Sequence, residues 1–204
     1  MKLLKFIFVF MIAVSLISCG KKNTDTKTTA PDNKDQKQTT TTTPTKTESS
    51  VAVLKSVDNS TGKNIAPLFS WTENGVEKST KDLKGKVLFV NFWATWCAPC
   101  KKEMPDLSTL SEDLKNKDFK MIGMCVAEGN DIPKIENILK AIPVSYTIVQ
   151  GNDNIVNAFK AASGNDMQAV PTSFIIDKSG KIVETIVGSK DKKYLTDKIN
   201  QYLN

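Results

Sequence analysis

Two cysteines separated by two residues constrain this chain more than any other feature. The segment Trp96-Cys97-Ala98-Pro99-Cys100 follows an apolar run, residues 86–93, that has the pattern of a buried strand. A helical pattern over residues 98–115 begins at the same motif. A CxxC pair alone is ambiguous, because zinc sites and haem attachment use the same spacing. A pair between a buried strand and an amphipathic helix is more specific, since both sulfurs then meet at the start of one helix.

Two residue types are missing, and their absence excludes several kinds of site. The chain has no histidine and no arginine among its 204 residues. Without histidine there is no Ser-His-Asp triad, no Cys-His pair and no histidine-ligated metal, and Lys101 stands where haem attachment needs histidine. We therefore expect no metal site. The net charge is +6, but the lysines are scattered rather than clustered, so we expect no nucleic-acid binding.

The first 50 residues have the composition of an export signal and a tether. Residues 1–18 start with lysines and continue with an apolar run too short to span a bilayer comfortably, and Cys19 follows. This pattern is typical of a bacterial lipoprotein signal, with acylation of Cys19 after cleavage; a plain signal peptide or an uncleaved anchor are the alternatives. Residues 19–50 form a low-complexity polar segment in which we expect disorder. The predicted location is extracytoplasmic, on the periplasmic side or the outer face of the cell membrane.

Residues 51–204 have the size of one domain with its own core. An Asn74-Gly75 turn predicts a hairpin of residues 69–72 and 76–79. Further strands are predicted over 86–93, 119–126, 145–149, 172–177 and 181–187, and helices over 98–115, 132–141, 154–162 and 191–202. This order predicts an α/β fold, with a central mixed sheet flanked by helices on both faces.

The segment Asn91-Phe-Trp-Ala-Thr-Trp-Cys-Ala-Pro-Cys-Lys-Lys-Glu103 and the later Val170-Pro171-Thr172 resemble the thioredoxin superfamily. Within it, the chain resembles the membrane-anchored TlpA/ResA/DsbE-like branch over residues 66–203. The hairpin, the approach at 83–86 and an inserted helix–strand element between Cys125 and Val170 favour this branch. So does Asn91, which stands where thioredoxin has a buried aspartate. The resemblance implies a thioredoxin fold with an N-terminal β-hairpin, and we expect a monomer.

The two cysteines of the motif have different expected roles. Cys97 lies at the helix N-terminus, where unpaired N–H groups and the helix dipole favour a thiolate, so it is the candidate nucleophile. Cys100 lies one turn further and is the candidate resolving thiol. A purely structural disulfide is the alternative, but so short a loop gains little chain-entropy stabilisation. A redox-active Cys97–Cys100 disulfide needs no cofactor, and we expect none.

Four other residues complete the candidate site. Glu103 lies on nearly the same helical face as Cys100, where a partly buried carboxyl would have a raised pKa and could relay a proton. An exposed acid is the alternative, and the resemblance favours the relay. The resemblance also implies that Pro171 is cis and that Val170 offers its backbone to substrate. Trp96 is expected on the apolar rim of the site.

For two further residues, Trp93 and Cys125, the sequence leaves more than one interpretation open. Trp93 belongs either to the same apolar rim as Trp96 or to the core. Cys125, in a predicted central strand, is expected to pack as a buried thiol; a third redox partner or a sulfur ligand is the alternative.

The resemblance implies a membrane-tethered thiol-disulfide oxidoreductase outside the cytoplasm. Its expected direction is reduction of disulfides in exported proteins, with recharging by a membrane electron donor. A disulfide oxidase or isomerase, or a non-catalytic thioredoxin-fold binding module, are the alternatives. A peroxiredoxin is excluded by the missing arginine and by Thr95, which stands two rather than three residues before Cys97. A copper chaperone of this fold is also excluded, because it needs a CxxxC motif and a histidine, and this chain has neither. The sequence does not distinguish between possible substrates, which include apocytochrome c, oxidised methionine sulfoxide reductase and other exported proteins.

Overall fold

The computed structural model describes residues 50–59, 62–126 and 131–204. The predicted signal peptide over residues 1–18, the acylation site Cys19 and all but the last residue of the predicted tether lie outside the described residues. Among the helices of the described ranges, none is both long enough and apolar enough to cross a bilayer.

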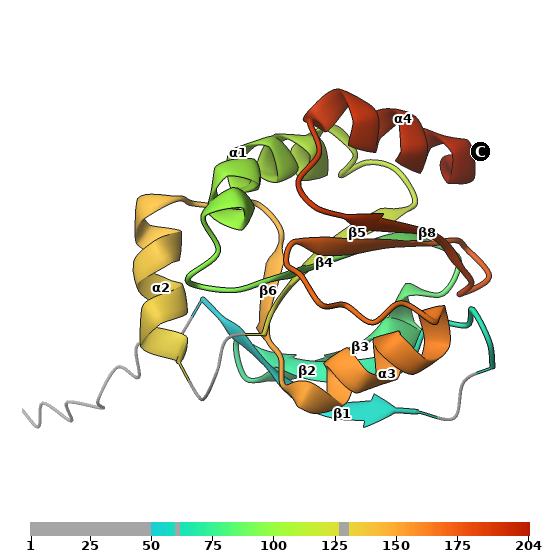
Figure 1. The fold of residues 1–204 in the computed structure, drawn as a ribbon, viewed down its shortest axis with the longest axis horizontal. Helices are drawn as coiled ribbons and strands as arrows, with labels where there is room; N and C mark the ends of the chain where they lie inside the picture. Colours follow the sequence, from blue (N-terminus) through green and yellow to red (C-terminus); the bar gives the residue numbers. More distant parts are fainter. Residues whose placement is uncertain (1–49, 60–61, 127–130) are drawn as a thin grey trace, which may run out of the picture. The chain divides into compact units, whose positions relative to one another are not determined.

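In the described part of the chain, eight strands form one mixed sheet with the spatial order β3-β2-β1-β6-β5-β4-β7-β8 (Figure 1). The strands are β1 Ala52–Asp58, β2 Leu68–Glu73, β3 Val76–Ser79, β4 Val87–Trp93, β5 Phe119–Cys125, β6 Thr147–Gln150, β7 Thr172–Ile176 and β8 Ile182–Val187. β4 pairs parallel with β5 and antiparallel with β7. All of its residues are buried, because both faces of this central strand are covered.

Among the described residues, four α-helices cover the two faces of this sheet: α1 Ala98–Asp113, α2 Ile132–Ala141, α3 Asp153–Ser163 and α4 Lys192–Leu203. The core on one face includes residues of α1, α2 and α4, whereas α3 packs on the other face. In Figure 1, α1 and α4 lie above the sheet and α3 lies below it. The predicted mixed sheet with helices on both faces is therefore confirmed.

The predicted hairpin is confirmed as β2 and β3, which are antiparallel. Its turn residues Asn74 and Gly75 have φ angles of 52° and 74°, the left-handed conformation that an Asn-Gly turn supplies. The strand before it, β1, was not predicted, because Ala52–Asp58 mixes buried and exposed positions without a clean alternation. β1 pairs antiparallel with β2 and parallel with β6, so it joins the hairpin to the main sheet.

Two predicted boundaries were wrong by two residues, the end of α1 and the start of β6, whereas the other predicted ends agree with the structure to within one residue. α1 ends at Asp113, because the N–H of Leu114 donates to the carbonyls of Leu110 and Glu112 and closes the helix. β6 begins at Thr147 rather than at residue 145. The Ser145 N–H donates to Ser108 Oγ at 2.9 Å, and its hydroxyl donates to the Ser108 carbonyl at 2.8 Å, so this residue is tied to α1 instead of the sheet.

Candidate active site

The end of β4 delivers the CxxC pair to the start of α1. Cys97 is the N-cap residue of α1, and the Cys100 N–H donates to Cys97 Sγ at 3.2 Å. Pro99 lies in the first turn, where its fixed φ suits a helix start and its missing N–H costs no hydrogen bond. The predicted helix start is therefore built so that the helix N-terminus faces the Cys97 sulfur.

The two cysteines form a disulfide in this structure. Cys97 is 3% exposed and Cys100 is 1% exposed, so the protein covers both sulfurs in the oxidised state. The two sulfurs therefore differ little in exposure in this form.

Pairing of β4 with β7 brings the downstream Val170-Pro171 segment to the disulfide. Thr172, the first residue of β7, pairs with Phe92 near the end of β4. The Val170–Pro171 peptide bond is cis, and the Val170 carbonyl oxygen lies 3.5 Å from Cys97 Sγ. The backbone before Pro171 thus borders the sulfur that is the candidate nucleophile.

The two tryptophans near the motif separate clearly. Trp96 is 70% exposed beside Cys97, whereas Trp93 is 2% exposed and belongs to the core. Trp93 therefore does not line the rim, and the alternative that it is a core residue is the correct one. Trp96 is a large apolar side chain available to a partner at the mouth of the site.

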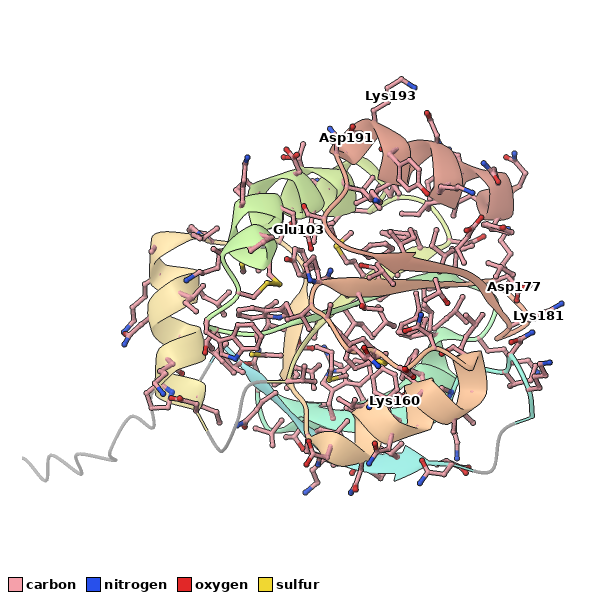
Figure 2. All side chains as sticks on the ribbon, in the orientation of Figure 1. Glu103, Lys160, Asp177, Lys181, Asp191 and Lys193 are labelled. Atoms are coloured by element: carbon pink, nitrogen blue, oxygen red, sulfur yellow. A yellow bond between two sulfur atoms is a disulfide. The ribbon has the colours of Figure 1, made fainter. Side chains whose placement is uncertain are left out.

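Glu103 is more deeply buried than the sequence predicted. Its side chain comes from α1 (labelled in Figure 2) and the residue is only 6% exposed. Asn91 Nδ2 donates to Glu103 Oε1 at 3.0 Å and also contacts Ser173 Oγ at 3.0 Å. These three buried side chains join α1, β4 and β7 into one polar cluster.

Burial raises the pKa of Glu103 above its usual value of 4.5, because the charged carboxylate loses solvation. Hydrogen bonds from the Ser189 side chain, from Asn91 and from the Lys190 backbone offset part of this rise. Burial, and then the charge of Glu103, also raise the pKa of Tyr146, which keeps that phenol neutral. Glu103 is therefore a carboxyl whose proton affinity is set by a desolvated, hydrogen-bonded environment.

A hollow of about 620 Å³ connects Glu103 to the surface. It is bordered by the first turns of α1 and by the loop before α4, with Pro99, Lys102, Ser189 and Lys190 in its lining. A carboxyl that is nearly buried yet borders such a hollow can exchange protons with solvent.

Sequence reasoning missed Ser173 and Ser189. Ser173 could have been found from the antiparallel pairing of β4 and β7, which places it directly opposite Asn91. Ser189 lies in the loop that leads to α4, and nothing in the local pattern distinguishes it from an ordinary loop serine.

Cys125 ends β5 opposite Trp93 and is 1% exposed within the core. Its expected burial is confirmed. Its thiol lies outside the Cys97–Cys100 disulfide.

A thioredoxin-type sheet, a disulfide at the start of a helix and a cis-proline segment beside it define a thioredoxin-like oxidoreductase of thiols and disulfides. The family model described as Redoxin matches residues 29–203, and the chain belongs to this family.

Its relatives carry names of the same class. A thiol-disulfide oxidoreductase ResA of Bacillus cereus is 36% identical over 132 residues, which are 64% of this chain and 72% of the relative. ResA of Bacillus subtilis (strain 168) is 31% identical over 128 residues, 62% of this chain and 67% of the relative.

A solved structure of a thioredoxin-family thiol:disulfide interchange protein from Chlorobium tepidum TLS is also similar. Its TM-score is 0.62 at 31% identity, and the match covers 71% of this chain and 99% of that one. With its Cys97–Cys100 pair in place, the chain is a thiol-disulfide oxidoreductase of the thioredoxin-like kind.

Proposed function

We propose that the protein is an extracytoplasmic, membrane-tethered reductase of protein disulfides. The observation that carries the direction of electron flow is the buried Glu103 carboxyl next to the CxxC helix turn. Strong oxidants of this fold stabilise the reduced state through a favoured thiolate. A desolvated carboxylate near the sulfurs opposes a thiolate instead. A dithiol in such a setting holds its electrons weakly and tends to donate them.

The reaction proceeds in two exchange steps. The Cys97 thiolate attacks one sulfur of a substrate disulfide, forms a mixed disulfide and expels the other substrate sulfur as a thiolate. Cys100 then loses its proton to Glu103 and attacks Cys97 Sγ, which releases the second substrate thiolate. The substrate gains two electrons, and the Cys97–Cys100 pair becomes the disulfide seen in the structure.

Two features support the proton path and the substrate path. Glu103 passes its proton to a substrate thiolate or to solvent through the hollow beside Ser189 and Lys190. The Val170 backbone and the exposed Trp96 provide an extended segment of substrate with a polar and an apolar contact. A membrane donor of two electrons returns the pair to the dithiol state. The protein needs no other cofactor and acts as a monomer.

The tether in this proposal rests on the sequence alone. The lipoprotein-type signal and Cys19 support acylation, and the polar segment after it supports a flexible spacer between membrane and domain. Incorporation of a labelled fatty acid by producing cells tests this point. We expect a labelled protein, and we expect Cys19→Ser to lose the label while Cys125→Ser keeps it.

The direction of electron flow is tested by the reduction potential of the Cys97–Cys100 couple. We expect a value near or below that of thioredoxin, about −270 mV. A value near about −120 mV, as for a strong oxidant, would instead support the disulfide oxidase. A value near about −180 mV would support the isomerase.

The substrate is tested by trapping in cells. In Cys100→Ala the mixed disulfide on Cys97 cannot resolve, so the partner stays bound and can be identified after non-reducing electrophoresis. The double variant Cys97→Ala/Cys100→Ala is the control and should trap nothing.

A further inference from the structure

A second hollow of about 450 Å³ lies at the other end of the sheet from the disulfide. It is bordered by the start of β4, the end of β7 and the 3₁₀ turn Thr80–Leu83, whereas the disulfide lies at the end of β4. Its floor is apolar and includes Leu68, Leu83, Leu88 and Ile176. The size and the apolar floor fall in the range of small-molecule sites in proteins.

Backbone hydrogen bonds fix the walls of this hollow. The Ala66 N–H donates to the Gly180 carbonyl at 2.9 Å, and the Gly85 N–H donates to the Lys178 carbonyl at 3.3 Å. The turn between β7 and β8 thus holds both the segment before β2 and the segment before β4. Backbone contacts between these segments therefore hold the walls of the hollow together.

Four lysines stand around the apolar floor: Lys81, Lys84, Lys86 and Lys178. Lys178 Nζ donates to the Leu203 carbonyl at 2.7 Å, and Lys86 Nζ lies 4.0 Å from Asp118 Oδ1. Within the described ranges, the ion pairs of the structure include neither Lys81 nor Lys84, so both charges are available to a ligand.

Two carboxylates also border the hollow, Asp58 and Asp177. The Asp177 carboxylate already accepts from the Ser179 N–H, the Ser179 hydroxyl and the Lys181 N–H, at 2.6 to 3.0 Å. Figure 2 shows Asp177 and Lys181 at the end of the sheet away from Glu103. With four lysines against two acids, the rim of this hollow has a net positive charge.

We propose that this hollow binds an amphiphilic anion, that is, a carboxylate or phosphate head on an apolar chain. The apolar floor takes the chain, and Lys81 and Lys84 take the head through charge-assisted hydrogen bonds. A cationic amphiphile is disfavoured by the four lysines. The lysine-rich segment over residues 20–49 is a poor occupant for the same reason. The site is independent of the redox function, because it lies at the opposite end of β4.

Decanoate at neutral pH is the probe, and its binding to the purified chain is followed by calorimetry and by amide chemical shifts. We expect saturable binding below about 1 mM, with the largest shifts at Leu68, Gly85 and Gly180. Lys81→Gln/Lys84→Gln should weaken binding about tenfold, which corresponds to about 1.4 kcal/mol. Lys81→Arg/Lys84→Arg keeps the charges and should bind as the parent chain does. Lys193→Gln, an exposed lysine of α4, is the matched control and should change nothing.

A second arm separates the two sources of this chemistry. Vesicles of phosphatidylcholine and phosphatidylglycerol in equal amounts are added to the purified chain without decanoate. Binding to the vesicles that Lys81→Gln/Lys84→Gln loses identifies a lipid headgroup as the ligand, and no binding identifies a free acid; both outcomes support the site.

The proposal is overturned if decanoate does not saturate, or if decyltrimethylammonium binds equally well. It is also overturned if Lys193→Gln weakens binding as much as the double variant, or if a peptide of residues 20–49 displaces decanoate. The reduction potential of the double variant should equal that of the parent chain, so failure here is distinguishable from failure of the proposed reductase.

Discussion

The two faces of β4 are packed in different ways. On the face covered by α3, Phe92 lies against Phe159 and Phe174, with ring centroids 5.0 and 5.8 Å away. On the face covered by α1, the side-chain amide of the buried Asn91 donates hydrogen bonds to Glu103 and Ser173. One strand therefore supplies an aromatic core to one side and a polar cluster to the other.

The aromatic face contributes to the stability of the fold, whereas the polar face contributes the ionisable group of the candidate site. Burying aromatic side chains stabilises the fold, and ring pairs at these distances add to that effect. Burying a carboxyl opposes folding unless hydrogen bonds compensate, and Asn91 supplies one. We infer that the α3 face holds the sheet rigid, so that the α1 face can keep a desolvated acid next to the disulfide.

The largest expected effect tests the aromatic face. Phe159→Ala removes the ring at the centre of the cluster on α3, and we expect a loss of about 3–5 kcal/mol in the free energy of unfolding. Urea unfolding measures this loss. The reduction potential of the folded fraction should stay unchanged. A shifted reduction potential would show that the two faces are not separate in function.

A matched pair of glycines gives the next effect. A Cβ on Gly123 would lie 2.7 Å from Ile148 Cδ1 and 2.9 Å from Tyr146 Cε2, on the α1 face. A Cβ on Gly151 would lie 2.7 Å from the flexible Met124 side chain, on the α3 face. We expect Gly123→Ala to destabilise by about 1–3 kcal/mol. Gly151→Ala should cost less than about 1 kcal/mol, since methionine readily adapts.

Urea midpoints of both alanine variants, measured at one pH in the oxidised state, test this pair. Equal losses would show that the aromatic face tolerates added volume no better than the polar one.

The smallest effect is the pH dependence of stability that Glu103 contributes. Its folded pKa is raised above 4.5, so it binds its proton more tightly in the folded than in the unfolded state. Its contribution is fully present below about pH 4.5 and is lost as the pH rises through the folded pKa. Glu103→Gln lacks this dependence, so we expect the variant to gain stability relative to the parent chain between acid and neutral pH.

Urea unfolding of both proteins at several pH values measures that difference. A stability difference that stays constant across this range would mean that Glu103 titrates normally in the folded state.

Much of the fold could be predicted because its signals are local. The apolar run of β4, the Asn74-Gly75 turn and the Val170-Pro171-Thr172 segment each specify their element within a few residues. β1 escaped prediction because its residues do not alternate, and only pairing with β2 and β6 makes it a strand. Such pairings join residues far apart in sequence.

Part of the candidate site also has local sequence signals, and the rest depends on contacts between residues far apart in sequence. The CxxC pair is visible in the sequence, and the spacing of Cys100 and Glu103 places both on one helical face. The contact of Asn91 with Ser173 and the Ser189 hydroxyl near Glu103 depend on strand register and on a loop conformation. No local pattern encodes these, so the depth of burial of Glu103 could not be predicted.

The thiol titration of the reduced protein tests most directly the claim that Glu103 controls proton handling at the dithiol. Thiolate absorbance is followed against pH for the parent chain, for Glu103→Gln and for Glu112→Gln, an exposed acid on the same helix outside the hollow. We predict that Glu103→Gln moves the titration to lower pH, because a carboxylate no longer opposes the thiolates, while Glu112→Gln leaves it unchanged. Superimposable curves for the parent chain and Glu103→Gln would contradict the account.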